Sequence, residues 1–397
     1  MRRGTSSAQY VRTLHLYPDV LAEYLSRIKT SLSARLYIHT IVPISVNHRN
    51  RETAMAQMLH LVGSMSHVTD FRIATQGDSP RSEFREQIVT VGWTAFGSTL
   101  RSLTLLVPLR ERNFPLNPTL VFPTLEHLTI ELSCRHYSGD TKIVYKLLIP
   151  FVNNHHSTLR SLVLSLPMDS HPDVFSWWSG ICHLPYLTNF TFHCGLPSEV
   201  PDTSALWQIL TKHSNQLTEL KFSFTIPWTV LPMPNNWFKQ PFLYVALPRL
   251  ESLHVSLDCF SNTFQTAAYL RQFKNSLTTL KLMGRRLTCD EVGLIVNAFE
   301  GQNRLRTLHL EVDYLGSALF DLLSRKFPGL DGLHLVFIWV NCGFNQTTGR
   351  QPYSEWKLRH FTARPHLRVE PHILSEWQTV VGAVLPHLHT LRVAFST

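Results

Sequence analysis

The chain has 397 residues, of which 44% are hydrophobic and 16% are charged, and its formal net charge is +9. This well-buried composition excludes an intrinsically disordered protein. No uninterrupted apolar run reaches the roughly 18 residues of a membrane span, and no apolar stretch follows the N-terminal arginines, so we expect neither a membrane segment nor a secretory signal.

An apolar spacing of the form L-x-x-L-x-L recurs along almost the whole chain. From Val68 onward its matches follow one another at intervals of 25 to 34 residues. A period in this range indicates stacked units that bury their apolar faces against their neighbours. The matches begin at Val11, Val68, Leu100, Leu125, Leu159, Leu187, Leu217, Leu250, Leu277, Leu305, Leu330, Leu358 and Leu388.

The interval from Val11 to Val68 spans about two periods. We predict a degenerate fourteenth unit in its middle, with Ser33 in the first motif position and Leu36 and Ile38 in the last two. The whole chain is then one solenoid of about 13 to 14 repeats, irregular over 1–67 and regular over 68–397.

Within each motif, the fourth and sixth residues point to the same face of an extended chain. We therefore expect Leu103 with Leu105, and Leu280 with Leu282, to point inward, while the residue between them faces solvent. Parallel strands stacked in this way need a crossover, and apolar residues at helical spacing precede many of the motifs. These predicted helices lie at 54–65, 141–152, 204–213, 264–273, 290–299, 317–327 and 373–384.

The fold class predicted from these elements is an α/β leucine-rich-repeat horseshoe, with parallel strands on its concave face and helices or loops on its convex face. Many proteins of this class place an inward asparagine three residues after the motif. Here the slot holds other residues, such as Pro108, Gly195 and Asp258, so the turns must satisfy their buried backbone groups in another way.

The motifs start alternately with Pro-x-Leu and with Ser- or Asn-x-Leu, and the chain opens with YVRTLHL at Tyr10 to Leu16 and HLVGSMSHVTDFRI at His60 to Ile73. This pattern resembles the leucine-rich region of fungal F-box proteins. The resemblance implies a substrate receptor of an SCF-type (Skp–cullin–F-box) ubiquitin ligase, in which the F-box binds the Skp adaptor and the repeats hold the substrate.

Ten residues precede the first motif, too few for a helical F-box with its own core. We therefore expect the F-box to be missing from this chain, and the Skp adaptor to be a partner only if an F-box lies upstream. A free-standing leucine-rich scaffold or inhibitor unrelated to ubiquitin is the alternative. An RNA-binding or anion-binding solenoid is a third, because the net charge is positive, although the basic residues form no recognisable nucleic-acid module.

The residue between the two inward positions would face the concave surface, and this column contains no acidic residue. Thr, Lys, Arg and His simply suit an exposed strand, which is one interpretation. The other is a surface for an acidic or phosphorylated segment of a partner, which its histidines would strengthen as pH falls through about 6.5. The candidate partner-binding residues of the column are Arg72, Lys221, His254, Lys281, His309, His334 and Arg392.

A second candidate surface is the aromatic and proline-rich segment from Ile226 to Tyr244. Exposed aromatic side chains there would form an interaction hot spot on the rim. Alternatively, they fill the space left by a missing helix. The rim candidates are Trp228, Trp237, Phe238 and Phe242.

The sequence contains none of the common catalytic or cofactor-binding motifs. No phosphate-binding glycine loop and no nucleophile elbow occurs, and the carboxylates are scattered, so we expect no enzyme activity and no cofactor. The pairs His155 with His156 and His387 with His389 have no cysteine or carboxylate at metal-ligand spacing. The six cysteines form no C-x-x-C pair, and we interpret them as the reduced thiols of a cytoplasmic or nuclear protein.

Overall fold

The computed structural model describes residues 10–18, 21, 34–36, 44–46, 51–75, 83–108, 119–133, 144–166, 178–195, 202–225, 240–260, 262–301, 304–340, 353–366 and 371–393. The chain divides into two compact units, Met1–Gln216 and Leu217–Thr397. We call them the N-terminal unit and the C-terminal unit.

The N-terminal unit contains a parallel sheet in which each strand pairs with the strand of the next repeat. Its strands follow one another in the order β1 (Thr13–Leu16), β4 (Asp70–Ala74), β5 (Ser102–Pro108), β6 (His127–Ser133), β7 (Ser161–Leu166) and β8 (Asn189–Gly195). The helices of this unit include α3 (Arg51–Gly63), α4 (Glu83–Phe96), α5 (Ile149–Asn154), which follows a π-helical turn at Val144–Leu148, and α6 (Ser204–His213).

The C-terminal unit repeats this arrangement. Its parallel strands follow the order β9 (Glu219–Thr225), β10 (Ser252–Ser256), β11 (Thr279–Met283), β12 (Thr307–Leu315), β13 (Gly332–Val340), β14 (His360–Pro365) and β15 (Thr390–Val393). The crossovers contain 3-10 turns at Pro241–Tyr244 and Leu257–Cys259 and the helices α7 (Thr263–Arg271), α8 (Cys289–Asn297), α9 (Ser317–Lys326) and α10 (Pro371–Val384).

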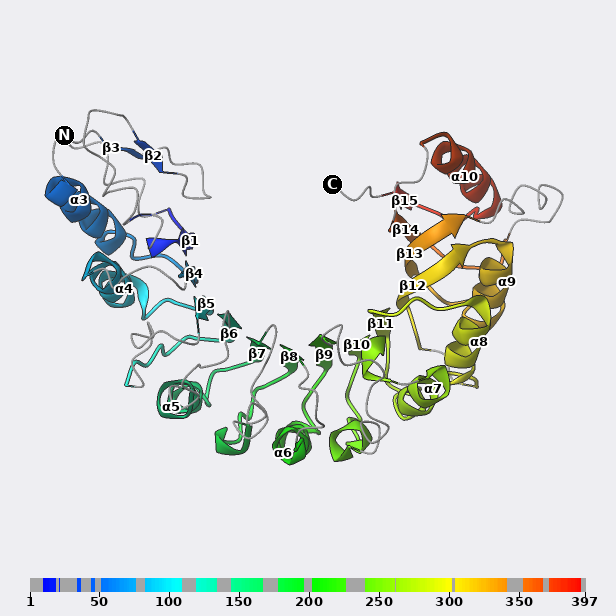
Figure 1. The fold of residues 1–397 in the computed structure, drawn as a ribbon, viewed down its shortest axis with the longest axis horizontal. Coiled ribbons are helices and arrows are strands. Elements are labelled where there is room, and N and C mark those ends of the chain that lie inside the picture. The colour runs from blue at the N-terminus through cyan, green and yellow to red at the C-terminus, as the bar shows by residue number, and fades with distance from the viewer. Residues whose placement is uncertain are drawn as a thin grey trace. The chain divides into compact units, whose positions relative to one another are not determined.

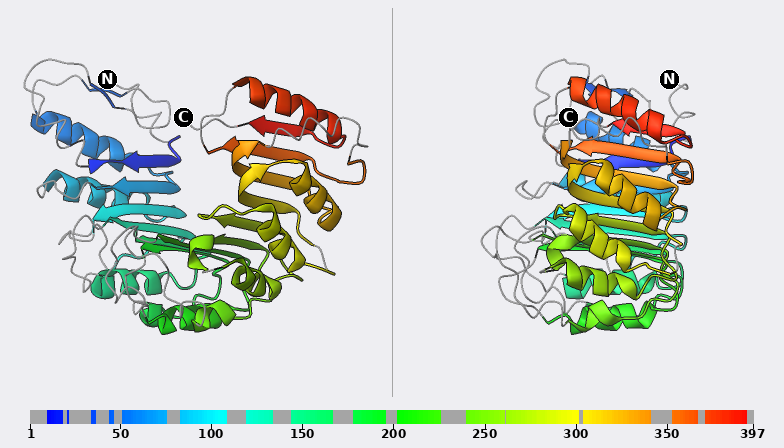
Figure 2. Two further views of the ribbon diagram at one scale, coloured as in Figure 1. Left: turned by 45° about the vertical axis from the view of Figure 1, so that its right-hand side comes forward. Right: turned by 90° about the vertical axis from the view of Figure 1, so that its right-hand side faces the viewer.

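The helices of the C-terminal unit lie on one side of its sheet. Figure 1 shows α7, α8, α9 and α10 along the same side of β11 to β15, and the right-hand view of Figure 2 shows these strands running side by side behind the helices. The other side of the sheet carries no described helix. We call this side the open face.

The strands lie where the repeat predicts them, because each parallel strand begins two residues after the first residue of a motif. The predicted inward positions form the core: Leu103, Leu105, Leu280 and Leu282 are all fully buried. The side chains between them are half-buried and face the open side. This α/β architecture, with neighbouring strands paired in chain order, is compatible with a solenoid.

The predicted fourteenth unit is wrong. Residues 34–36 form β2 (Ala34–Leu36), which pairs antiparallel with β3 (Ile44–Val46) in a separate two-stranded sheet. An antiparallel partner close in sequence completes the backbone hydrogen bonds without the long crossover that a parallel partner needs. Ser33 and Ile38 lie outside the described residues.

Helices α3, α6, α7, α8, α9 and α10 overlap the predicted ranges, and α5 covers the end of the range 141–152. The sequence analysis missed α4, whose buried side chains include both the apolar Ile88 and the charged Arg85. A buried arginine interrupts the apolar stripe by which an amphipathic helix is recognised.

Buried histidines bind the turns that precede two of the motifs, those beginning at Leu125 and Leu187. The backbone N–H of Phe122 donates to Nε2 of His155, and that of Leu184 donates to Nε2 of His213, both at 2.9 Å. The Nδ1 atoms lie 2.7 Å from the carbonyl oxygens of Phe151 and Ile209, one helical turn back. An accepting Nε2 requires a neutral ring with its proton on Nδ1. Each imidazole therefore ties the end of one repeat to the turn of the preceding repeat.

Candidate functional site

The column predicted from the motif is in register in both units. In the N-terminal unit, the residues that stand opposite one another are His15, Arg72, Thr104, Thr129, Val163 and Thr191. In the C-terminal unit they are Lys221, His254, Lys281, His309, His334, Thr362 and Arg392. The register therefore brings five of the seven candidate residues onto adjacent strands.

These five residues, Lys221, His254, Lys281, His309 and His334, form the basic column of the C-terminal unit. They lie on β9 to β13, one residue per strand, and all are half-buried. Because adjacent strands are about 4.8 Å apart, the two lysines stand about 10 Å from each other with His254 between them. The column thus presents alternating ammonium and imidazole groups across the strands.

The contacts within the column leave one lysine without a described acidic partner. Lys221 forms an ion pair with Glu219 on its own strand, with 2.7 Å between Nζ and Oε1. No ion pair is found for Lys281 among the described residues. The rings of His309 and His334 stack in parallel, with 3.9 Å between their centroids and 5° between their planes. Lys281 is therefore the positive centre without an ion pair among the described residues, and it is flanked by imidazoles on both sides.

The pKa values of these histidines are lowered, first by burial and then by neighbouring positive charge. For His254 the neighbours are Lys281 and Lys221, and its pKa is about 4. For His309 they are His334, Lys281 and His254, and its pKa is also about 4. Burial, Lys281 and His360 lower the pKa of His334. The prediction that the column gains charge near pH 6.5 is therefore wrong for the free protein.

The other two column candidates lie apart from this group. Arg72 belongs to the N-terminal unit, where His15 and Thr104 stand opposite it. Its Nε atom is buried and makes no hydrogen bond within the described part of the chain. Arg392 lies on β15, opposite Thr362, and is exposed.

The prediction of an exposed rim is wrong for Phe242, the rim candidate that lies within the described residues. Phe242 is 2% exposed and packs edge-on against Phe222, with 5.6 Å between the ring centroids. It fills the core below β9, as the alternative interpretation of this segment proposed. Trp228, Trp237 and Phe238 lie outside the described residues.

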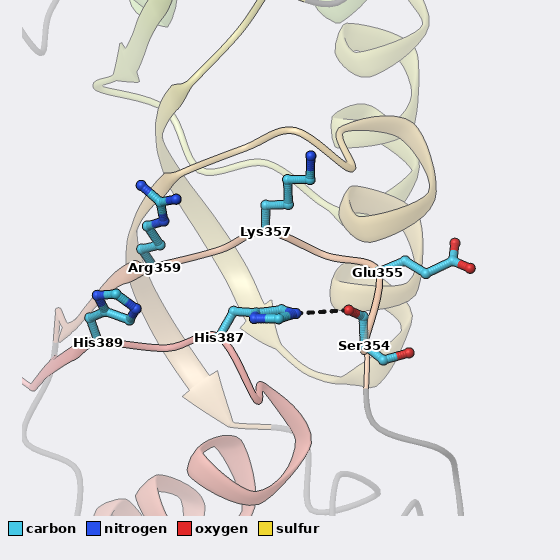
Figure 3. Close-up of a pocket in the computed structure, with 6 residues that line it drawn as sticks. All are labelled: Ser354, Glu355, Lys357, Arg359, His387 and His389. Carbon is cyan, nitrogen blue, oxygen red and sulfur yellow. Dashed lines mark hydrogen bonds between the residues drawn. The ribbon is translucent and has the colours of Figure 1, made fainter.

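A pocket at the start of β14 and β15 escaped the sequence analysis. Its volume is about 590 Å³, and its lining residues are Ser354, Glu355, Lys357, Arg359, His387 and His389. Figure 3 shows that Glu355 and Lys357 point in different directions, while His387 points toward Ser354. The alternation of His387 and His389 around a strand start was the available signal, but the facing loop at 353–359 is fixed only by the fold.

Most charged or titratable groups of this pocket already have a partner or share the pocket with a group of opposite charge. Nε2 of His387 lies 2.9 Å from the carbonyl oxygen of Ser354, and Nε of Arg359 lies 3.6 Å from Oδ1 of Asp331. Lys357 shares the pocket with the carboxylate of Glu355. In the basic column, no ion pair of Lys281 is found among the described residues. The column is therefore the stronger candidate site.

Two further findings concern the described residues alone. They contain no group of three His, Cys, Asp or Glu side chains placed to hold a metal ion. None of their helices combines the length and the apolar character needed to cross a membrane.

Comparison with known proteins gives little to add to this geometry. No family model matches the chain, and no curated protein matches it. A crystal structure of a protein from Bacteroides fragilis aligns with 79% of this chain and 80% of its own, with 13% identical residues and a TM-score of 0.36. A similarity this weak carries no argument about function.

Proposed function

We propose that this chain is a non-enzymatic leucine-rich-repeat protein that recognises an acidic segment of a partner protein through the basic column of its C-terminal unit. One observation carries the proposal. The register places Lys221, His254, Lys281, His309 and His334 side by side on a sheet face that no described helix covers.

The electrostatics of the column favour an anionic partner. Positive charge on one surface attracts a negative segment, raises its association rate and fixes its position. Among the described residues, four acidic side chains share this face with the column: Glu219, which already pairs with Lys221, Asp258 after β10, and Glu311 and Asp313 on β12. An acidic segment lying across the strands would meet Lys221 and Lys281 about 10 Å apart.

We propose further that the partner is a substrate of an SCF-type ubiquitin ligase. The support is the resemblance of the alternating Pro-x-Leu and Ser- or Asn-x-Leu motifs to the repeats of fungal F-box proteins. In such a receptor the repeats hold the substrate, which agrees with a binding surface on the open face.

The direct test is a charge reversal on the column. We expect the double variant Lys221→Glu/Lys281→Glu to bind a fluorescent Asp- and Glu-rich peptide about tenfold or more weakly at low salt, because it turns attraction into repulsion. Arg271→Glu/Lys274→Glu makes the same change of charge at the end of α7 and serves as the matched control. Fluorescence anisotropy measures both affinities.

Equal affinities of the two double variants would overturn the column as the binding surface. Replacing the peptide by a single-stranded RNA of similar charge tests the nucleic-acid alternative. If the RNA binds more tightly and its affinity falls more steeply with salt, the protein-recognition proposal is wrong. Co-purification with the Skp adaptor and a cullin, after tagging the gene at its own locus so that any upstream F-box is retained, supports the ligase role, and their absence would favour a free-standing scaffold.

A further inference from the structure

The basic column combines a permanent charge with groups that can acquire one. Lys281 lies between His254 on β10 and His309 on β12, and His309 stacks on His334. Among the described groups that shift the pKa values of these rings, Lys221 and Lys281 are positive and Glu219 is negative. The charged and titratable groups on this face are Glu219 and Lys221 on β9, Asp258 after β10, Lys281 on β11, Glu311 and Asp313 on β12, His360 and Arg364 on β14, and Arg392 on β15.

We propose that the basic column binds its anionic partner together with protons, which are taken up by His254, His309 and His334. This inference rests on the proposed function and adds to it a regulation of binding by pH. The partner is an acidic protein segment, and its affinity rises as the surroundings become more acidic.

The geometry gives the reason. In the free protein, burial and the neighbouring lysines keep these imidazoles neutral, with pKa values of about 4 for His254 and His309. The parallel stack adds to this, because two protonated rings 3.9 Å apart would repel each other. A negative group laid across the column brings opposite charge close to the rings, and it therefore raises the pKa of each ring it approaches.

The size of the effect follows from linkage. A histidine whose pKa rises from about 4 to about 6.5 on binding strengthens binding about tenfold when the pH falls from about 7.5 to about 5.5. The sign is fixed: the bound form holds more protons than the free form, so affinity increases toward acid. Lysines alone give no such change, because they remain charged throughout this range.

Isothermal titration calorimetry of the full chain tests the proposal. The probe is a peptide carrying sulfotyrosine, because its sulfate esters stay ionised from about pH 5.5 to about pH 7.5, whereas phosphate and carboxylate groups titrate near this range. Titrations at about pH 5.5 in two buffers with different heats of ionisation give the number of protons taken up. We expect at least one proton per peptide, and an affinity at least tenfold higher than at about pH 7.5.

The matched variant is His254→Asn/His309→Asn/His334→Asn, which retains both lysines of the column and removes the titrating rings. Its readout is the ratio of the affinities at the two pH values, whatever its absolute affinity. We expect this ratio to fall to about one and the proton uptake to vanish. Circular dichroism at both pH values verifies that each protein is folded.

The outcomes separate this inference from the proposed function. Peptide binding with no proton uptake in the unmodified chain overturns the proton linkage and leaves acidic-segment recognition standing. No binding at either pH overturns both. Uptake that persists in the triple variant assigns the protons to other groups and also overturns the proposal.

Discussion

The histidines with lowered pKa values lie between the repeats in the N-terminal unit, but on the open face in the C-terminal unit. His155 and His213 are each 1% exposed and accept a backbone N–H, so their rings are structural. His254 and His309 are half-buried among lysines. The same shift of pKa therefore has two meanings, and the surroundings of the ring decide between them.

The columns of the two units also differ. The column of the N-terminal unit begins with His15 and Arg72 and continues with three threonines and a valine, whereas the column of the C-terminal unit contains two lysines and three histidines before Thr362 and Arg392. The inward leucines of the two sheets are equally buried. The two units thus have the same kind of core and differ in the residues of their columns.

We expect the largest loss of stability from substitutions of the inward leucines, which both units contain. Leu280→Ala or Leu308→Ala in the C-terminal unit should lower the free energy of unfolding by about 2 to 5 kcal/mol, because each removes a fully buried side chain and leaves a cavity. Leu103→Ala in the N-terminal unit should cost a similar amount. Urea denaturation measures these losses. A loss under about 0.5 kcal/mol at both Leu280 and Leu308 would contradict the assigned register.

The structural role of His213 predicts a dependence of stability on pH. Burial is the main cause of its pKa of about 4, compared with 6.5 in an unfolded chain. Since the unfolded state takes up the proton first, stability should fall as the pH drops from about 6.5 to about 4, by about 3 kcal/mol in total.

The variant His213→Leu isolates this contribution. It should be less stable at neutral pH by about 1 to 3 kcal/mol, because the N–H of Leu184 loses its acceptor, and its stability should vary less with pH in this window. Denaturation curves at several pH values measure both effects. A variant with the full pH dependence of the unmodified chain would exclude His213 as its source.

We expect the smallest loss of stability from a substitution at the start of a helix. Helix α8 begins with a capping box, in which Oγ1 of Thr288 accepts from the N–H of Glu291 and the Glu291 carboxylate accepts from the N–H of Thr288. Thr288→Ala should therefore cost about 1 kcal/mol. In the N-terminal unit, the first N–H of α6, that of Ser204, donates instead to Oδ1 of Asp202 at 2.8 Å. Thermal melts measure the loss, and an unchanged midpoint would show that the cap contributes nothing.

Most of the strand framework was predictable, because a motif residue such as Leu280 must face the core whatever its neighbours are. The column was predictable for the same reason. The pairing of β2 with β3 was not, because local antiparallel pairing competes with a weak repeat signal. The structural roles of His155 and His213 were hidden because a histidine at a helix end looks like any other, and its backbone partner lies about one repeat away.

Within the candidate site, the sequence identified which residues share a face but not their charge states. The lowered pKa values of His254 and His309 arise from burial, which no spacing reveals. Phe242 was misassigned because an aromatic side chain near prolines has the same appearance on a rim as in a core, and only its contact with Phe222 decides.

The most direct test compares one column residue from each unit. Lys281→Glu and Arg72→Glu make the same change of charge, one in the basic column and one in the column of the N-terminal unit. Anisotropy titrations with the acidic peptide should show about tenfold weaker binding for Lys281→Glu and a change of less than about twofold for Arg72→Glu. Equal losses, or a larger loss for Arg72→Glu, would contradict the assignment of partner recognition to the open face of the C-terminal unit.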